Sequence, residues 1–280
     1  MGHPVRIGEV DTARSRTGSR RHLAFTAWAA ILSLFFGVLF TGVTLLTLTL
    51  WYADPGYAET NPVVDLGFFA LGVVLIGSGF AVQLRTPERH VSGLQQALIG
   101  LAALAVAGLI GERIEPLVGA LLFLLAASIL VVLHPARHEL LRRGARTSLL
   151  LGVAALAGAV PAGIYAAGML TLARAAGPSC FLGECARGDR FAEMAALAVA
   201  VVLVCGLAGV GTPGWRVSAW CAGAAAAIVG LASVALPQVA GSLGTPGGAL
   251  AVAWGVLVMA AAERERRQPA TPAITGSEPE

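Results

Sequence analysis

Eight long apolar segments constrain this chain more than any other feature. They cover about residues 23–50, 64–82, 93–110, 117–133, 149–172, 192–210, 217–236 and 247–262. A helix needs about 20 mostly apolar residues to cross a bilayer, and these segments come close to that length or exceed it. Only 12% of the residues are charged, against about 25% in a typical soluble domain. The sequence therefore predicts an all-α fold, a polytopic transmembrane helix bundle with eight spans.

The basic residues give these spans a direction. All 19 are arginines, and most of them lie in the two tails and in the loops that follow the second, fourth and sixth spans. Cytoplasmic loops are enriched in basic residues, so we expect a multi-pass protein of the cell membrane with both termini in the cytoplasm. Residues 1–22 and 263–280 are predicted to be disordered cytoplasmic tails around a membrane domain of residues 23–262. A retinal Schiff base requires a lysine, so the class of rhodopsins is excluded.

A short pattern occurs twice and suggests an internal repeat. Thr86-Pro87 and Val91-Ser92 flank the loop after the second span, and Thr212-Pro213 and Val217-Ser218 flank the loop after the sixth. The same offset places the first four spans on the last four. This pattern favours two parallel four-helix halves, residues 23–134 and 148–262, related by an axis along the membrane normal. The alternative is similar turn chemistry, because Pro ends helices and Ser begins them.

Polar residues gather on the predicted extracytoplasmic side, where acids outnumber arginines. One interpretation is an acid-lined site for a cation or a polar head group. The other is that loop acids are solvated and that acids at helix N-termini interact favourably with the helix dipole. The candidate residues for this outer-face site are Asp54, Glu59, Asp65, Glu112, Arg113, Glu115, Asp189, Arg190 and Glu193.

Cysteines and histidines indicate structure more than metal chemistry. Cys180 and Cys185 share one predicted outer loop, and thiols outside the cytoplasm are commonly oxidised, so we expect a disulfide between them. Two cysteines are too few for a structural zinc site. The histidines fall in predicted cytoplasmic loops and tails, which argues against haem ligation within the membrane. We expect no metal and no cofactor.

Three function classes are compatible with these patterns. The first is a transporter, permease or lipid-translocating protein whose site opens to the extracytoplasmic side. The second is an intramembrane enzyme that acts on a lipid or isoprenoid through the outer-face acids, and the third is a non-catalytic assembly subunit. We favour the first, because the chain contains eight spans and no sizeable soluble domain. The expected partners are membrane lipids and a small polar or lipid ligand, with no nucleic acid, and the oligomeric state stays open.

Overall fold

The computed structural model describes residues 7–53, 61–141, 147–177 and 186–267, and it confirms the all-α helix bundle. Within these residues there is no strand, and eight helical segments are long and apolar enough to cross a membrane. The chain is thus a multi-pass membrane protein. Its long helices are α1 (Ile7–Ala53), α4 (Val91–Ile110), α5 (Ile114–Leu133), α6 (Leu149–Ala175), α7 (Ala186–Gly209), α8 (Trp215–Ala235) and α9 (Gly244–Arg267), and its second span is made of shorter pieces.

The second span, Pro62–Leu84, changes its helical geometry along its length. It begins as α2 (Pro62–Phe69), continues as a π-helix, η1 (Ala70–Gly77), and ends as α3 (Ser78–Ala81) and η2 (Val82–Leu84). A π-helix shifts the backbone hydrogen bonds by one residue and is frequently found at functional sites. This irregular backbone lies inside the bundle, where neighbouring helices satisfy its polar groups.

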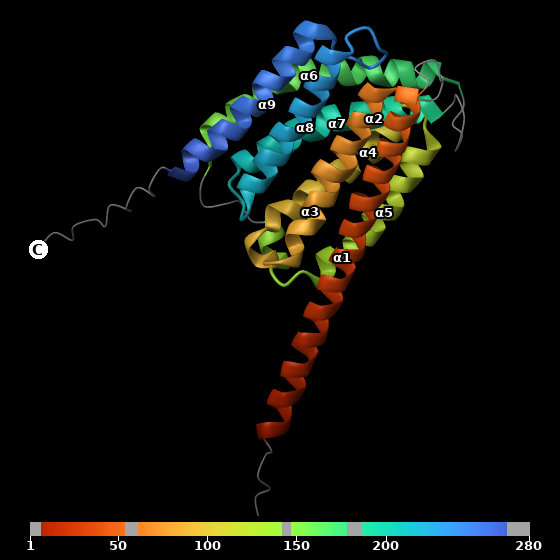
Figure 1. Cartoon of the computed structure of the whole chain (residues 1–280). Helices are drawn as coiled ribbons and strands as arrows, with labels where there is room; N and C mark the ends of the chain where they lie inside the picture. Colours follow the sequence, from red (N-terminus) through yellow and green to blue (C-terminus); the bar gives the residue numbers. More distant parts are fainter. Residues whose placement is uncertain (1–6, 54–60, 142–146, 178–185, 268–280) are drawn as a thin grey trace, which may run out of the picture.

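Four spans form the centre of the bundle and four surround it. The buried share of the apolar stretch is 72% for the second span, and 50%, 61% and 56% for α4, α7 and α8. It is only 22% for α1 and α5, and 28% for α6 and α9. Figure 1 shows α6 and α9 at one side and α1 and α5 at the other, with the central spans between them. The four peripheral helices, α1, α5, α6 and α9, therefore present most of the surface that faces lipid.

The packing of the two halves follows one scheme. The second span packs on α1 and α4 in the first half, as α7 packs on α6 and α8 in the second. Across the halves, α4 contacts α7 and α8 contacts the second span. At the loops that carry the predicted repeat, the Ser218 hydroxyl donates to the carbonyl oxygen of Ser92, 126 residues earlier, at 3.4 Å. The internal repeat itself stays a prediction.

The observed helix limits lie close to the predicted ones, with three differences. Helix α9 ends at Arg267 rather than Ala262, so the first five residues of the tail predicted to be disordered are helical. Helix α1 begins at Ile7 rather than Leu23, because residues 7–22 contain no proline to stop a helix that continues into the span. Helix α7 begins at Ala186 rather than Ala192, so its first turns include Asp189 and Arg190. The start of the first span and the end of α9 lie on the same side of the bundle. We call that side the inner face, and the opposite side the outer face.

Candidate functional site

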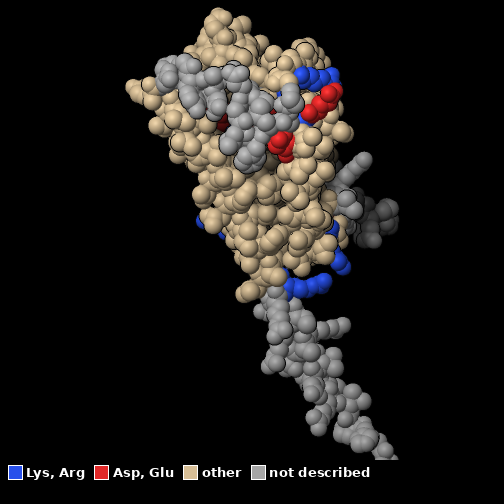
Figure 2. Space-filling view, turned by 90° about the vertical axis from the view of Figure 1, so that its right-hand side faces the viewer, with Lys and Arg blue, Asp and Glu red and all other residues tan. Residues whose placement is uncertain are grey.

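Charged side chains are concentrated at the two faces. Figure 2 shows acidic and basic side chains together near the upper end, basic side chains at the lower end, and an uncharged band between them. Such a band is the surface expected of a protein whose middle lies in hydrocarbon. Two polar clusters, one toward each face, are candidates for a functional site.

The outer cluster is centred on Arg190, in the first turns of α7. Its Nη1 atom lies 3.1 Å from Oε2 of Glu193, and its Cζ atom lies 3.6 Å from the centre of the Phe68 ring. Phe68 in turn stacks on Phe40 of α1, with ring centres 4.2 Å apart. A cation above an aromatic face is favourable. The guanidinium thus ties α7 to α2 and α1.

Asp65 lies beside this pair and belongs to the start of α2. The side chain of Asn61 caps the helix by accepting from the backbone N–H groups of Val63 and Val64, and the N–H of Asn61 donates to Oδ2 of Asp65 at 3.3 Å. Asp65 is 3% exposed. The structure therefore brings Asp65, Arg190 and Glu193 together, and it gives Asp65 a helix-capping role as well.

Arg113 lies at the turn between α4 and α5 and is buried, at 1% exposure. Its Nη2 atom donates to the carbonyl oxygen of Ala173, and its Nε atom lies 4.0 Å from Oδ1 of Asp189. The guanidinium packs against Gly188, where a Cβ atom would overlap it. Nε and Nη1 make no hydrogen bond within the described residues. This arginine links α5, α6 and α7 at the outer face.

The other predicted outer residues are dispersed. Glu112 is exposed, has a φ of 59°, and places Oε1 3.9 Å from Nε of Arg174. Glu115 is half-buried on the first turn of α5. Four predicted site residues, Asp54, Glu59, Cys180 and Cys185, lie outside the described residues, so the disulfide stays a prediction.

The turn between α8 and α9 closes over the outer ends of the central spans. The Tyr165 hydroxyl of α6 donates to the carbonyl oxygen of Gly241 at 2.5 Å, and Nδ2 of Asn61 donates to that of Ala240 at 2.7 Å. Gly241 has a φ of 85°, and a Cβ atom there would lie 2.9 Å from Cγ1 of Val64. A glycine is required by this close approach. The turn therefore joins both halves at the outer face.

The inner cluster was not predicted, and it lies where the second span changes geometry. Nε2 of Gln96 donates to the carbonyl oxygen of Leu75 in the π-helix at 2.7 Å and to Oγ of Ser78 at 3.0 Å. Oγ of Ser78 lies 3.2 Å from Sγ of Cys221 on α8. Gln96 is 0% exposed, and its Oε1 atom has no hydrogen-bond partner among the described residues. At a rise of about 1.5 Å per residue, Gln96 lies about 8 Å from the inner end of α4.

A second buried glutamine lies closer to the inner face and is fully paired. Nε2 of Gln83 donates to the carbonyl oxygen of His90 at 2.8 Å and to that of Gly79 at 3.4 Å. Nδ1 of His134 accepts from the N–H of Ala136 at 3.1 Å, so the ring proton sits on Nε2 and is donated to Oε1 of Gln83 at 3.3 Å. Burial lowers the pKa of His134, a shift that the nearby Glu88 carboxylate opposes. This network joins the loops after the second and fourth spans.

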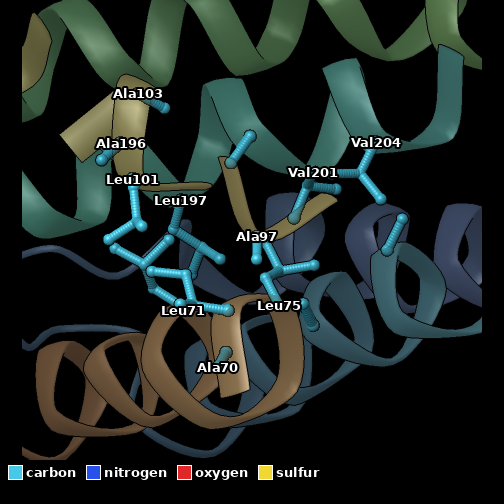
Figure 3. Close-up of a cluster of buried hydrophobic side chains, with 14 of the residues drawn as sticks. Ala70, Leu71, Leu75, Ala97, Leu101, Ala103, Ala196, Leu197, Val201 and Val204 are labelled. Carbon is cyan, nitrogen blue, oxygen red and sulfur yellow. The ribbon is translucent and has the colours of Figure 1, made fainter. Parts of the chain in front are cut away.

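An apolar layer separates the two clusters. Figure 3 shows Leu71 and Leu75 of the π-helix facing Leu101 of α4 and Leu197 of α7. All four side chains are buried, at 4% exposure or less. Packed aliphatic side chains at native density leave no path for water or a polar solute. The described structure is therefore closed between the inner and the outer cluster.

No protein-family model, no curated protein and no solved structure matches this chain. Its function must therefore be inferred from the two clusters. Among the described residues, no group of three or more His, Cys, Asp and Glu side chains is placed to hold a metal ion.

The sequence contained a signal for the inner cluster. Gln95 and Gln96 lie inside an apolar span, as do Ser78 and Gln83, and buried amides in a membrane require partners. The charged residues led to the prediction of a site at the outer face, whereas the uncharged amide side chains mark the polar positions between the helices.

Proposed function

We propose that this protein is a transporter of a small, neutral, polar solute, and that its two four-helix halves move against each other to open the inner cluster. In this proposal the protein lies in the cell membrane, with both termini in the cytoplasm. The observation that carries it is the buried Oε1 atom of Gln96, which lies beside the π-helix and has no hydrogen-bond partner in the part of the chain that the structure describes.

The chemistry of the inner cluster supports a solute that donates hydrogen bonds. An unpaired buried carbonyl costs about 1–3 kcal/mol, and a bound N–H or O–H group would remove that cost. The hydroxyl of Ser78 accepts from Gln96 and donates to the carbonyl oxygen of Val74, so the thiol of Cys221, 3.2 Å away, is the donor in its contact with Ser78. The cluster side chains of Gln96, Ser78 and Cys221 are uncharged, so they offer a carboxylate or ammonium group no opposite charge.

The backbone next to the cluster supports movement. Interrupted helices recur at the binding sites of transporters, where unwound carbonyls contact substrate or ion. Here the π-helix exposes the carbonyl oxygen of Leu75 to a side chain of another helix. Ser78 belongs to the first half and Cys221 to the second, so the cluster spans the interface between the halves. A relative rotation of the halves would open it.

The outer cluster fits a closing role in this proposal better than a catalytic one. Three acids, Asp189, Glu193 and Glu112, each lie within 4.0 Å of an arginine nitrogen. A general acid or base must reach the reacting atoms of a substrate, whereas these carboxylates face arginine side chains of the protein itself. These pairs instead hold α5, α6 and α7 together at the outer face. In this proposal, the outer-face residues that the sequence predicts as a binding site instead keep the outer face closed.

Thiol modification tests this proposal with two cysteines of the chain itself. Two variants are made that retain only Cys221 or only Cys205, with the other cysteines replaced by alanine. Cys205 is the matched control, because it is fully buried in α7 and donates to the carbonyl oxygen of Leu151 at 3.5 Å. Each variant is reconstituted in liposomes and treated with a charged, membrane-impermeant methanethiosulfonate, which reacts with thiolates in water.

We expect Cys221 to react at least an order of magnitude faster than Cys205, and a saturating neutral solute that binds the inner cluster to slow the reaction. Opening of the interface admits water to Cys221 alone. Equal, slow rates for both cysteines would contradict the proposal, because the inner cluster would then never meet water.

A further inference from the structure

We propose that the protein holds one phospholipid at a specific site on its lipid-facing surface. One acyl chain lies in a groove between α4, α6 and α7, the phosphate binds Arg174, and the head-group amine binds Glu112. This inference is independent of the proposed transport function. The groove has a volume of about 260 Å³ and is lined by apolar residues that include Ile99, Val106, Ile110, Leu170, Val199 and Leu203.

The shape of the groove fits an extended chain. Along α4 it runs from Ile99 to Ile110, which is about 16 Å at about 1.5 Å per residue. Val106 is 54% exposed and Leu203 is 51% exposed, so the groove is reached directly from the bilayer. All its lining residues are alanines or larger aliphatic residues, which suits a methylene chain and no polar occupant.

The polar end of the groove carries a complementary pair of charges. Arg174 lies one turn beyond Leu170 on α6, and its Nε and Nη2 atoms donate to the carbonyl oxygen of Ile110 at 2.9 and 2.6 Å. These bonds fix the guanidinium at the mouth of the groove, while its side chain stays 52% exposed. A guanidinium has five N–H donors, so donors remain for a phosphate.

Glu112 provides the opposite charge. Its side chain is 80% exposed, and Oε1 lies 3.9 Å from Nε of Arg174. A head group with a phosphate and a primary amine matches this pair, because each of its charges meets an opposite one. Glu112 has a φ of 59°, a left-handed conformation that is unfavourable for a non-glycine residue. The turn holds its carboxylate beside Arg174 in spite of that cost.

The predicted repeat explains why the second half has room for a chain. With the 126-residue offset of Ser92 and Ser218, Ala166 of the groove corresponds to Phe40. The Phe40 ring packs against Gly72 and stacks on Phe68. The corresponding position of the first half is therefore filled by a side chain, whereas the small Ala166 leaves a space for lipid.

Native mass spectrometry tests the site. The protein is purified in a mild detergent, stripped of lipid, and titrated with phosphatidylethanolamine, phosphatidylglycerol or diacylglycerol of equal chain length. The variant Ala166→Phe places a ring in the groove. Its control is Ile164→Phe, because Ile164 lies on the same helix but is 71% exposed. Arg174→Gln removes the phosphate contact, and Arg85→Gln, at the inner face, is its control.

We expect one phosphatidylethanolamine per chain, at least tenfold weaker binding in Ala166→Phe and Arg174→Gln, and no change in the controls. Glu112→Gln should remove the preference over phosphatidylglycerol. Equal binding of diacylglycerol, equal loss in both phenylalanine variants, or a stable dimer without lipid would overturn the proposal. Ala166→Leu replaces Ala166→Phe if the latter does not fold.

Discussion

Two buried glutamines should respond in opposite ways to the same substitution. Gln96 and Gln83 are both 0% exposed and both lie in the inner third of the bundle. Gln96 leaves Oε1 unpaired, whereas Gln83 uses both ends of its amide. Methionine has a similar length and no polar atom for these bonds. Replacing each residue by methionine therefore tests whether its polar side chain serves to bind a ligand or to stabilise the fold.

The structure sets the size of the effect at Gln96. The substitution removes its hydrogen bonds to Leu75 and Ser78, and hydrogen bonds between membrane helices contribute about 0.6 kcal/mol each on average. It also removes a buried oxygen whose lack of a partner costs about 1–3 kcal/mol. Gln96→Met should therefore leave the free energy of unfolding unchanged or raise it by up to about 2 kcal/mol.

At Gln83 the balance reverses. Gln83→Met leaves the Nε2–H of His134 without its partner, whereas the carbonyl oxygen of His90 still accepts from the N–H of Gly93 at 2.9 Å. An unpaired buried group costs about 1–3 kcal/mol, so the free energy of unfolding should fall by about 1–3 kcal/mol. The segment Arg137–Leu141 should lose order at the same time, because His134 accepts from the N–H of Ala136 just before it.

Both variants are measured by equilibrium unfolding in mixed micelles titrated with sodium dodecyl sulfate and followed by circular dichroism. A fall of more than 2 kcal/mol for Gln96→Met, equal to that of Gln83→Met, would refute the reasoning. Gln96 would then be a structural residue like Gln83. A stable Gln96→Met that no longer protects Cys221 upon solute addition would mark Gln96 as a residue retained for binding, in keeping with the usual conflict between stability and function.

Three further predictions concern single contacts. Gly223→Ala should cost about 1–3 kcal/mol, because its Cβ would lie 2.6 Å from a backbone oxygen of α9, whereas Gly168→Ala, in open space, should cost nothing in the same unfolding assay. The lowered pKa of His134 favours its neutral form in the folded protein, so the melting temperature should fall as the pH drops below about 6.5. This fall should be smaller in His134→Gln. In the control His138→Gln it should be the same as in the wild type. Tyr165→Phe should loosen the α8–α9 turn, measured as faster amide hydrogen exchange there.

The eight spans were predictable because hydropathy and helix length are local properties. Each span contains enough apolar residues to form its own helix and to enter lipid without information from its neighbours. Polar caps such as Asn61 and Ser148 then fix where helices begin, by accepting from backbone N–H groups in the first turn. These signals lie within a few residues of the element that they specify.

The division into central and peripheral spans was not predictable in the same way. Lipid and protein interior are equally apolar, so α5, with 22% of its stretch buried, and the second span, with 72%, have similar compositions. The carbonyl oxygen of Leu75 in the π-helix accepts from the amide of Gln96, which lies on another helix and 21 residues away in the chain. Such features depend on tertiary contacts that a pattern of hydropathy does not contain.

The halves share a packing scheme, yet individual side chains differ between them. Trp28 of α1 donates to the carbonyl oxygen of Ala126 on α5 at 2.8 Å. In the second half Trp254 of α9 donates to that of Ala154 on α6 at 2.9 Å. In the predicted repeat Ala154 corresponds to Trp28, so corresponding helix pairs are joined in both halves, with the tryptophan on opposite partners. Such a repeat would constrain where helices meet more than which side chains make the contact.

The same reasoning bears on the inner cluster. Applied to Gln96 and Ser78, the 126-residue offset leads to Ala222 and Val204, which cannot donate or accept hydrogen bonds through their side chains. The predicted repeat therefore gives no symmetric pair of half-sites, and the polar groups of the cluster come mainly from the first half. If the halves move against each other, a solute bound at Gln96 stays with the first half while the surface of α8 moves past it. The thiol of Cys221, on that surface, is the group whose surroundings should change most.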